Sequence, residues 1–298
     1  MNRMIFGLLA TAWLLWAAPA PVALASPVAE ASYPTAQAAA DALVHALKAH
    51  DEAELATVFG SDWRQVIPLE GVERQDVDSF VSFYEQKHAL VEQGGKTAIE
   101  VGNEHWTLPI PLAKGPDGWR FDLPAGRKEM TARRIEANQW SVVGAMLAYY
   151  DAQRDYASID RDGDHVPQYA SRLVSSPGKH DGLYWPDANG TDPSPLGKYF
   201  ATPPKGQEFL GYRYHILTSQ GPSAPGGAYS YMTGKRMTNG FALVAWPARY
   251  GQSGTVTFIV SHDGLVFQKD LGADTARVAA AMTSFDPDSS WAEVRTDY

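Results

Sequence analysis

The feature that most constrains this chain is a wide apolar face on a helical segment near its middle. Between residues 138 and 156, apolar side chains recur every three or four positions, as one face of an α-helix requires. The two stripes are Trp140, Val143, Leu147 and Tyr150, and beside them Val142, Met146, Tyr149 and Tyr156. Because two adjacent stripes make a broad face, we predict a helix that is capped by Asn138 and buried on more than one side.

The chain after residue 208 has the period of two that is typical of β-strands. The candidate strands are 210–216, 241–246, 256–260 and 265–269. The run 241–246 is continuously apolar, which is typical of a central strand, and Asp263-Gly264 predicts a hairpin turn. With a short helix at 273–282, residues 131–298 are predicted to form one domain in which a buried helix packs on an antiparallel sheet.

Three aspartates at alternate positions follow the predicted helix, in the run Asp160-Arg-Asp162-Gly163-Asp164. Calcium binds several oxygen ligands, so these three carboxylates are candidate calcium ligands. The run departs from the EF-hand loop, because glycine is fourth rather than sixth and Ser171 stands at position twelve. These departures favour the alternative, which is an Asp/Gly turn at the end of the helix.

A long irregular loop is predicted at 171–207, where prolines and glycines interrupt any periodicity. Its candidate ligand-binding residues are Lys179, His180, Asp181, Tyr184 and Trp185. Aromatic rings beside charged groups can bind a sugar or a peptide by stacking and hydrogen bonding. The alternative, which the usual burial of these residue types favours, is that Tyr184 and Trp185 attach the loop to the core.

The first 25 residues have the pattern of a secretory signal peptide. Arg3 precedes the apolar run 5–16, and Ala23-Leu-Ala25 is a cleavage signal. The apolar run is shorter than the roughly 20 residues of a spanning helix, and no later run is long enough. We therefore expect a periplasmic or secreted protein without a membrane span after cleavage, beginning with a loose leader at 26–33.

Composition narrows the classes of partner. The formal net charge is −9 and there is no basic cluster, so nucleic acid is not an expected partner. The chain has no cysteine, so its stability depends on its hydrophobic core rather than on disulfides.

Residues 34–130 are predicted to form a smaller α+β unit, with an NTF2-like fold as one candidate by analogy. Thr35 and Asp51 are expected to cap two helices, and a third is expected at 76–90 with His88 packed at its edge. Strands are expected at 97–101, 106–112 and 119–123, the last two joined by a turn at 115–118.

Several runs resemble a bacterial family, domain of unknown function 2950. They include Trp119-Arg-Phe-Asp122, Tyr150-Asp-Ala-Gln-Arg-Asp-Tyr156, residues 177–186, Gly211-Tyr-Arg-Tyr214 and Phe241-Ala-Leu-Val-Ala-Trp-Pro247. The resemblance covers nearly all of the chain after the signal peptide. It implies an exported bacterial protein and supplies no catalytic residues. The carboxyl-terminal half is also weakly similar to the globular heads of pseudopilins, some of which hold calcium in the loop.

Two functions are compatible with these patterns. Because no catalytic motif is present, we favour a non-catalytic module that binds an envelope protein or a glycan through the 171–207 loop. The alternative is a hydrolase of an envelope polymer such as peptidoglycan or another glycan. Its candidate carboxylates are Asp160, Asp162, Asp164 and Asp181, with His180 as acid or base. A His/Asp/Ser arrangement with His180 or His262 is a further form of this alternative.

Overall fold

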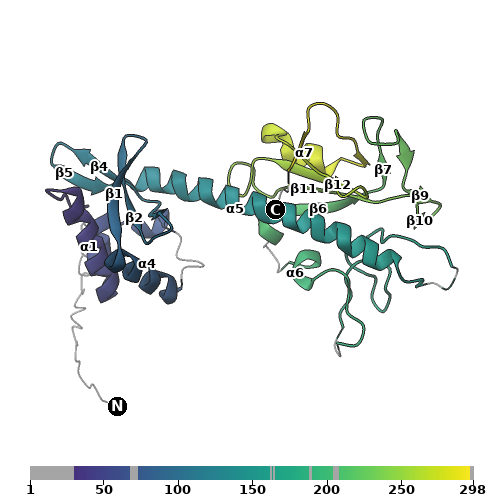
Figure 1. Cartoon of the computed structure of the whole chain (residues 1–298), viewed down its shortest axis with the longest axis horizontal. Helices are drawn as coiled ribbons and strands as arrows, with labels where there is room; N and C mark the ends of the chain where they lie inside the picture. Colours follow the sequence, from purple (N-terminus) through teal and green to yellow (C-terminus); the bar gives the residue numbers. More distant parts are fainter. Residues whose placement is uncertain are drawn as a thin grey trace, which may run out of the picture. The chain divides into compact units, whose positions relative to one another are not determined.

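The structure is a computed structural model of the chain, and it describes residues 30–67, 73–161, 163, 165–187, 190–203 and 208–295. It combines helices with mainly antiparallel sheets, which confirms the predicted α+β class. Two compact units are present (Figure 1). The first runs to Leu108 and includes Leu112–Phe121, and the second contains Pro109–Pro111 and the described residues from Asp122 onward. The predicted boundary lies between residues 130 and 131. The predicted signal peptide and residues 26–29 of the leader lie outside the described residues.

The first unit packs short helices against an antiparallel sheet. Its helices are α1 (Ala36–Ala49), α2 (Glu52–Phe59), α3 (Trp63–Val66) and α4 (Arg74–Gln86). Its strands are β1 (His88–Gln93), β2 (Lys96–Val101), β3 (Trp106–Thr107), β4 (Leu112–Gly115) and β5 (Gly118–Phe121). The sheet order is β1-β2-β4-β5, with β3 paired to β2, and α1, α2 and α4 contact these strands.

Both predicted helix caps in this unit are confirmed. The Thr35 hydroxyl accepts a hydrogen bond from the Ala38 N–H at 3.0 Å. The Asp51 carboxylate accepts hydrogen bonds from the N–H groups of Ala53 and Glu54 at 2.8 and 3.1 Å. Each bond satisfies an N–H group that the first turn of a helix leaves without an intrahelical partner.

The predicted helix at 76–90 is wrong at its carboxyl end, because α4 ends at Gln86 and His88 begins β1. The Gly94-Gly95 turn, in which both residues have positive φ, folds β1 back onto β2 as a hairpin. His88 stacks on the Tyr84 ring with 3.8 Å between centroids, so it is packed against the end of α4 as predicted.

The second unit is built around α5 (Leu123–Ala157) and a five-stranded antiparallel sheet. The sheet order is β15 (Ala292–Glu293), β13 (Val266–Lys269), β12 (Thr257–Ser261), β11 (Ala242–Pro247) and β6 (Tyr212–Leu217). Shorter strands are β7 (Ser219–Gln220), β8 (Tyr229–Ser230), β9 (Met232–Thr233), β10 (Arg236–Met237) and β14 (Ser284–Phe285). The remaining helices are α6 (Lys198–Ala201), α7 (Thr275–Ala280), η1 (Phe209–Gly211) and η2 (Gly272–Asp274).

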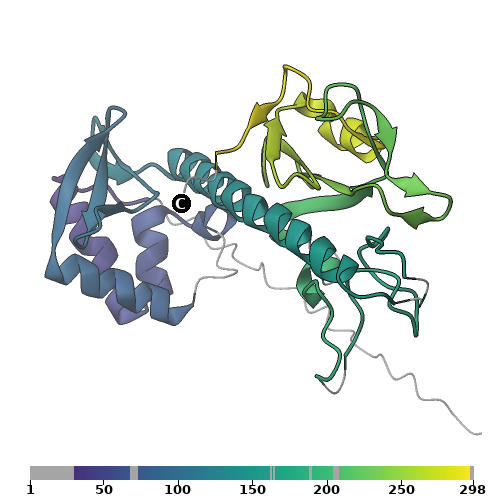
Figure 2. The ribbon, with the colours of Figure 1, turned by 45° about the vertical axis from the view of Figure 1, so that its right-hand side comes forward.

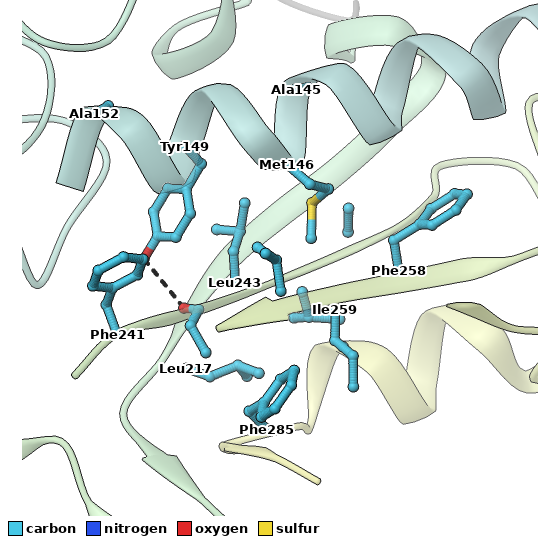
Figure 3. Close-up of a cluster of buried hydrophobic side chains, with 14 of the residues drawn as sticks. Ala145, Met146, Tyr149, Ala152, Leu217, Phe241, Leu243, Phe258, Ile259 and Phe285 are labelled. Carbon is cyan, nitrogen blue, oxygen red and sulfur yellow. Dashed lines mark hydrogen bonds between the residues drawn. The ribbon is translucent and has the colours of Figure 1, made fainter. Parts of the chain in front are cut away.

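The interior strand β11 is buried along its whole length, as its continuous apolar run predicts. Both α5 and α7 contact this strand, and Figure 3 shows Met146 and Tyr149 of α5 above the strands and Phe285 below them. Burial on both faces of the sheet removes the usual alternation of apolar and polar residues. The predicted hairpin is also confirmed, since β12 and β13 pair on either side of Asp263-Gly264.

The predicted start of the long helix at Asn138 is wrong. Asp122 is the cap and accepts a hydrogen bond from the Ala125 N–H at 2.9 Å, and Pro124 stands in the first turn. Asn138 lies inside α5, and its side-chain amide donates to the Ser253 carbonyl at 2.9 Å. The start was missed because the amino-terminal part of α5 is mostly polar and has no apolar period. One stripe residue also differs, because Trp140 is largely exposed.

The fully buried amide of Gln153 joins α5 to the chain that follows it. Its nitrogen donates to the Ala170 carbonyl and to the Tyr149 hydroxyl at 2.8 and 2.9 Å. Its oxygen accepts from the Ala170 N–H at 2.8 Å. Tyr149 in turn donates to the Ala242 carbonyl of β11 at 3.2 Å, as the dashed line in Figure 3 shows. Burial raises the pKa of Tyr149, so the phenol stays protonated and can donate this bond.

Among the described residues, no helix combines the length and the apolar composition that crossing a bilayer demands.

We predict that Gln153→Met lowers the free energy of unfolding by about 2–4 kcal/mol, because it leaves the buried N–H and carbonyl groups of Ala170 without their hydrogen-bond partner. Urea unfolding followed by circular dichroism measures the change. The control is Met146→Leu, a similar-sized change at another fully buried position of α5, which should cost less than about 1.5 kcal/mol. Equal losses in the two variants would show that the hydrogen bonds of Gln153 contribute nothing beyond packing.

Candidate functional site

The segment between α5 and β6 has little regular structure but is firmly attached to the core. Leu183, Trp185, Leu196 and Phe200 are buried in the main hydrophobic cluster of the second unit. Figure 2 shows this segment, in teal to green, as loops beside the carboxyl-terminal end of α5. In its described parts, the predicted loop at 171–207 is therefore attached to the core by buried side chains and is not a free linker.

Backbone hydrogen bonds fold part of the loop back on itself. The Tyr184 N–H donates to the Leu173 carbonyl at 2.9 Å, and the Ser175 N–H donates to the Tyr184 carbonyl at 2.8 Å. Gly182 lies so close to the backbone of Val174 that a Cβ at this position would be 2.7 Å from a carbonyl carbon. Glycine is required here because the two chain segments touch.

Trp185 is a buried residue that attaches the irregular loop to the core. It is 4 % exposed, and its indole N–H donates to the Asp192 carbonyl at 2.8 Å. His180 stacks on the indole ring with 4.3 Å between centroids. The Arg161 guanidinium lies 5.6 Å from the centroid of the same ring and 4.2 Å from that of Tyr156. The indole is thus enclosed by polar side chains and does not itself form an open stacking surface.

His180, Asp192 and Arg161 form a polar cluster around the Trp185 indole. The His180 Nδ1 is 3.3 Å from the Asp192 Oδ2, and both side chains are about half exposed. The Tyr156 hydroxyl donates to the His180 carbonyl at 2.7 Å and fixes the loop beneath the imidazole. Burial lowers the pKa of Arg161. The cluster offers a polar ligand both positively and negatively charged hydrogen-bonding groups.

The Asp181 carboxylate is used to hold a turn. It accepts hydrogen bonds from the Ser176 N–H at 2.6 Å and from the Ser176 hydroxyl at 2.9 Å, and Arg172 lies 3.8 Å away. These hydrogen bonds, above all that from the Ser176 N–H, lower the pKa of Asp181. Of the other candidate residues, Lys179 is exposed and Tyr184 is partly buried.

Asp160 also caps a turn. Its two carboxylate oxygens accept from the N–H groups of Gly163 and His165 at 2.8 and 2.9 Å. Asp187 repeats this arrangement with the N–H groups of Gly190 and Asp192. Asp162 and Asp164 lie outside the described residues, and the part of the chain that is described contains no group of three potential metal ligands. Calcium binding therefore stays a prediction.

His262, the other candidate base, lies beside the turn between β12 and β13. Its Nε2 is 3.2 Å from the Tyr229 hydroxyl and 3.9 Å from the Asp263 carboxylate. The groups next to this imidazole are a phenol and an acid, and the Ser261 hydroxyl is 3.5 Å from the Asp263 carboxylate.

An apolar groove of about 380 Å³ lies between α5 and residues 196–200 and 209–210, and no sequence pattern predicts it. Its lining residues are Ser141, Gly144, Ala145 and Ala148 of α5, together with Leu196, Gly197, Lys198, Tyr199, Phe200, Phe209 and Leu210. The wall on α5 has only short side chains, and a Cβ added to Gly144 would meet no atom within 4 Å. Tyr199, on the opposite wall, is 69 % exposed. The short side chains of α5 leave room for a ligand at this place.

Comparison with known proteins identifies the family. The profile described as Protein of unknown function (DUF2950) matches residues 30–294, which is most of the chain. The chain belongs to the DUF2950 family. This confirms the predicted family resemblance. The DUF2950 chain has no significant match among curated proteins or solved structures, so the NTF2-like and pseudopilin-like folds remain predictions.

We predict that the contribution of Asp181 to the stability of this DUF2950 chain depends on pH. Its pKa is lowered in the folded state, so the contribution is present above the unfolded pKa, about 3.9, and is lost as the pH falls through the lower folded value. Because this carboxylate is partly exposed, Asp181→Asn should cost at most about 1 kcal/mol at neutral pH. Urea unfolding at a series of pH values measures the difference.

Asp151→Asn, which changes an exposed carboxylate on α5, controls for the change in net charge and should have little effect at any pH. A penalty for Asp181→Asn that is as large at pH 2 as at pH 7 would contradict the role of the charged carboxylate.

Proposed function

We propose that this DUF2950 protein is exported to the bacterial cell envelope and that its second unit is a non-catalytic binding or assembly module. The supporting observation is the apolar groove between α5 and residues 196–200 and 209–210, beside loops whose side chains are buried in the core. Loops that a rigid scaffold holds in place are frequent binding surfaces. The signal-peptide pattern of residues 1–25 supports the proposed location.

The chemistry of the groove favours a protein segment as its ligand. Apart from Ser141 and Lys198, its lining consists of glycine, aliphatic and aromatic residues. A sugar would bury hydroxyl groups that need hydrogen-bond partners, and an unsatisfied buried hydroxyl is costly. An apolar side chain of an envelope protein would fill the same space without this cost. The polar cluster at His180 would contact more polar parts of the partner.

The hydrolase alternative requires two carboxylates that face one concave pocket. The described candidates, Asp160 and Asp181, each accept two hydrogen bonds from neighbouring groups, and neither lines the groove. These contacts favour the binding module. Release of reducing sugar ends from purified peptidoglycan, abolished by Asp160→Asn or Asp181→Asn, would instead establish the hydrolase.

We predict that the protein expressed in a bacterium is recovered from the periplasm or medium with Ser26 as its first residue. Mass spectrometry of the intact protein measures this directly. Leu14→Arg should keep the full chain in the cytosol, because a charge interrupts the apolar run that the export machinery recognises. Leu14→Ile is the matched control and should be exported normally. An uncleaved wild-type protein in the cytosol would refute the proposed location.

We predict that Gly144→Leu blocks binding to an envelope-protein fraction and weakens it by about tenfold or more, equivalent to about 1.4 kcal/mol. A Cβ at this position meets no atom within 4 Å, and leucine has a higher helix propensity than glycine, so the fold should be retained. Co-sedimentation of the purified protein with washed envelopes measures the affinity. Ala132→Leu adds the same side chain to an exposed position of α5 outside the groove and is the matched control.

The nature of the partner follows from enzymatic treatment of the envelopes. If the ligand is a protein segment, protease treatment abolishes binding and muramidase treatment does not. The reverse result would identify a glycan ligand. Equal binding by wild type and Gly144→Leu would show that the groove is not the contact surface.

A further inference from the structure

A second cavity, of about 290 Å³, lies in the first unit. One wall consists of Asp76, Ser79, Phe80 and Phe83, which share one face of α4, and the other consists of Val101 and Trp106 from β2 and β3. The wall residues on α4 follow the spacing of successive helical turns. Because α4 contacts β2, the helix holds this face opposite the strands.

Aromatic rings dominate the cavity and are unusually exposed. The rings of Phe80 and Trp106 meet edge to face, with 6.0 Å between centroids and an interplanar angle of 69°. Phe83 and Trp106 are 49 % and 46 % exposed, although such side chains are usually buried. Gly102 lies under the Phe83 ring, and a Cβ on this glycine would be 3.7 Å from the ring. The cavity therefore presents three rings, two of them nearly perpendicular.

The cavity also carries a negative charge. Asp76 is the acidic member of the six lining residues, and none of the six is basic. Its Oδ2 accepts a hydrogen bond from the Glu73 N–H at 2.8 Å, which holds the carboxylate in the first turn of α4. The charge of the whole chain is also negative, at −9. A cation is thus the charge type that complements this site.

We propose that this cavity binds an alkylammonium cation. The faces of aromatic rings attract organic cations through the ring quadrupole, with tryptophan the strongest and quaternary ammonium a preferred guest. Phe80, Phe83 and Trp106 surround the methyl groups, and Asp76 neutralises the charge. An uncharged apolar molecule would use the rings but not the carboxylate, and an anion would be repelled. This site lies in the first unit, so it is independent of the groove on α5.

Choline chloride is the probe, and 3,3-dimethylbutan-1-ol is its uncharged control of the same shape. The indole N–H resonance of Trp106, assigned with Trp106→Phe, is followed in nuclear magnetic resonance spectra of the ¹⁵N-labelled protein. We expect choline to shift this resonance in a saturable manner at millimolar concentrations and the alcohol to have little effect. Co-sedimentation with phosphatidylcholine vesicles then distinguishes a lipid headgroup from a free cation, since only a headgroup site retains the protein on the vesicles.

Two variants test the roles of the ring and the charge. Phe83→Leu keeps an apolar side chain at an exposed position but removes a ring, and it should weaken choline binding about two- to fivefold. Asp76→Asn keeps an oxygen that can accept from the Glu73 N–H and removes the charge, so it should also weaken binding of choline and leave the alcohol unaffected. Trp140→Leu changes an exposed aromatic residue of the other unit that lines neither cavity, and as the matched control it should bind choline normally.

Three results would overturn the proposal. The first is a Trp106 resonance that choline does not shift. The second is equal affinity for choline and for the uncharged alcohol, which would make the site merely apolar. The third is unchanged binding of choline in both folded variants, Phe83→Leu and Asp76→Asn. The fold of each variant is checked by the rest of its amide spectrum.

Discussion

The second unit depends on hydrogen bonds made in its interior by one side-chain amide. Gln153 satisfies both backbone groups of Ala170, and with Tyr149 it connects α5 to β11. A buried amide is tolerated only when its partners are complete, so this arrangement permits few alternative paths for the chain. The hydrogen bonds between Gln153 and Ala170 therefore set the path of the chain after α5. Buried side chains of the irregular segment then pack in the core. The loop surface around His180 lies on the segment that this attachment begins.

Much of the fold could be predicted because its signals are local. The capping side chains of Thr35 and Asp51, the Asp263-Gly264 turn and the apolar run of β11 each lie within a few residues of the structure that they determine. The start of α5 was missed although Asp122 and Pro124 mark it, because the helix is polar there and periodicity was given more weight. The helical spacing of α4 was extended through His88 to residue 90, which concealed the start of β1, a strand that the Gly94-Gly95 turn pairs with β2.

The candidate sites were less predictable because they depend on residues distant in sequence. His180 and Trp185 were named from the sequence, but their contacts with Arg161 and Asp192 arise only when the loop folds back. The groove exists because α5 has no large side chain at Gly144 or Ala148. Small residues in a helix give no sequence pattern that indicates a binding site. The aromatic cavity forms because the fold brings Phe83 and Trp106 to one surface. In the sequence alone, neither residue can be distinguished from an ordinary core residue.

The interior attachment at Gln153 uses only uncharged groups: an amide, a phenol and peptide units. These groups keep their protonation states over the pH range in which carboxylates and imidazoles titrate, and dissolved ions have little effect on the hydrogen bonds between them. The ionic contacts of the loop, such as those of Asp181 and His180, lie at its surface. Changes in the pH or the salt concentration of the surroundings should therefore alter the ionic contacts on the loop surface, and with them the binding of other molecules there. The hydrogen-bonded interior should keep its structure.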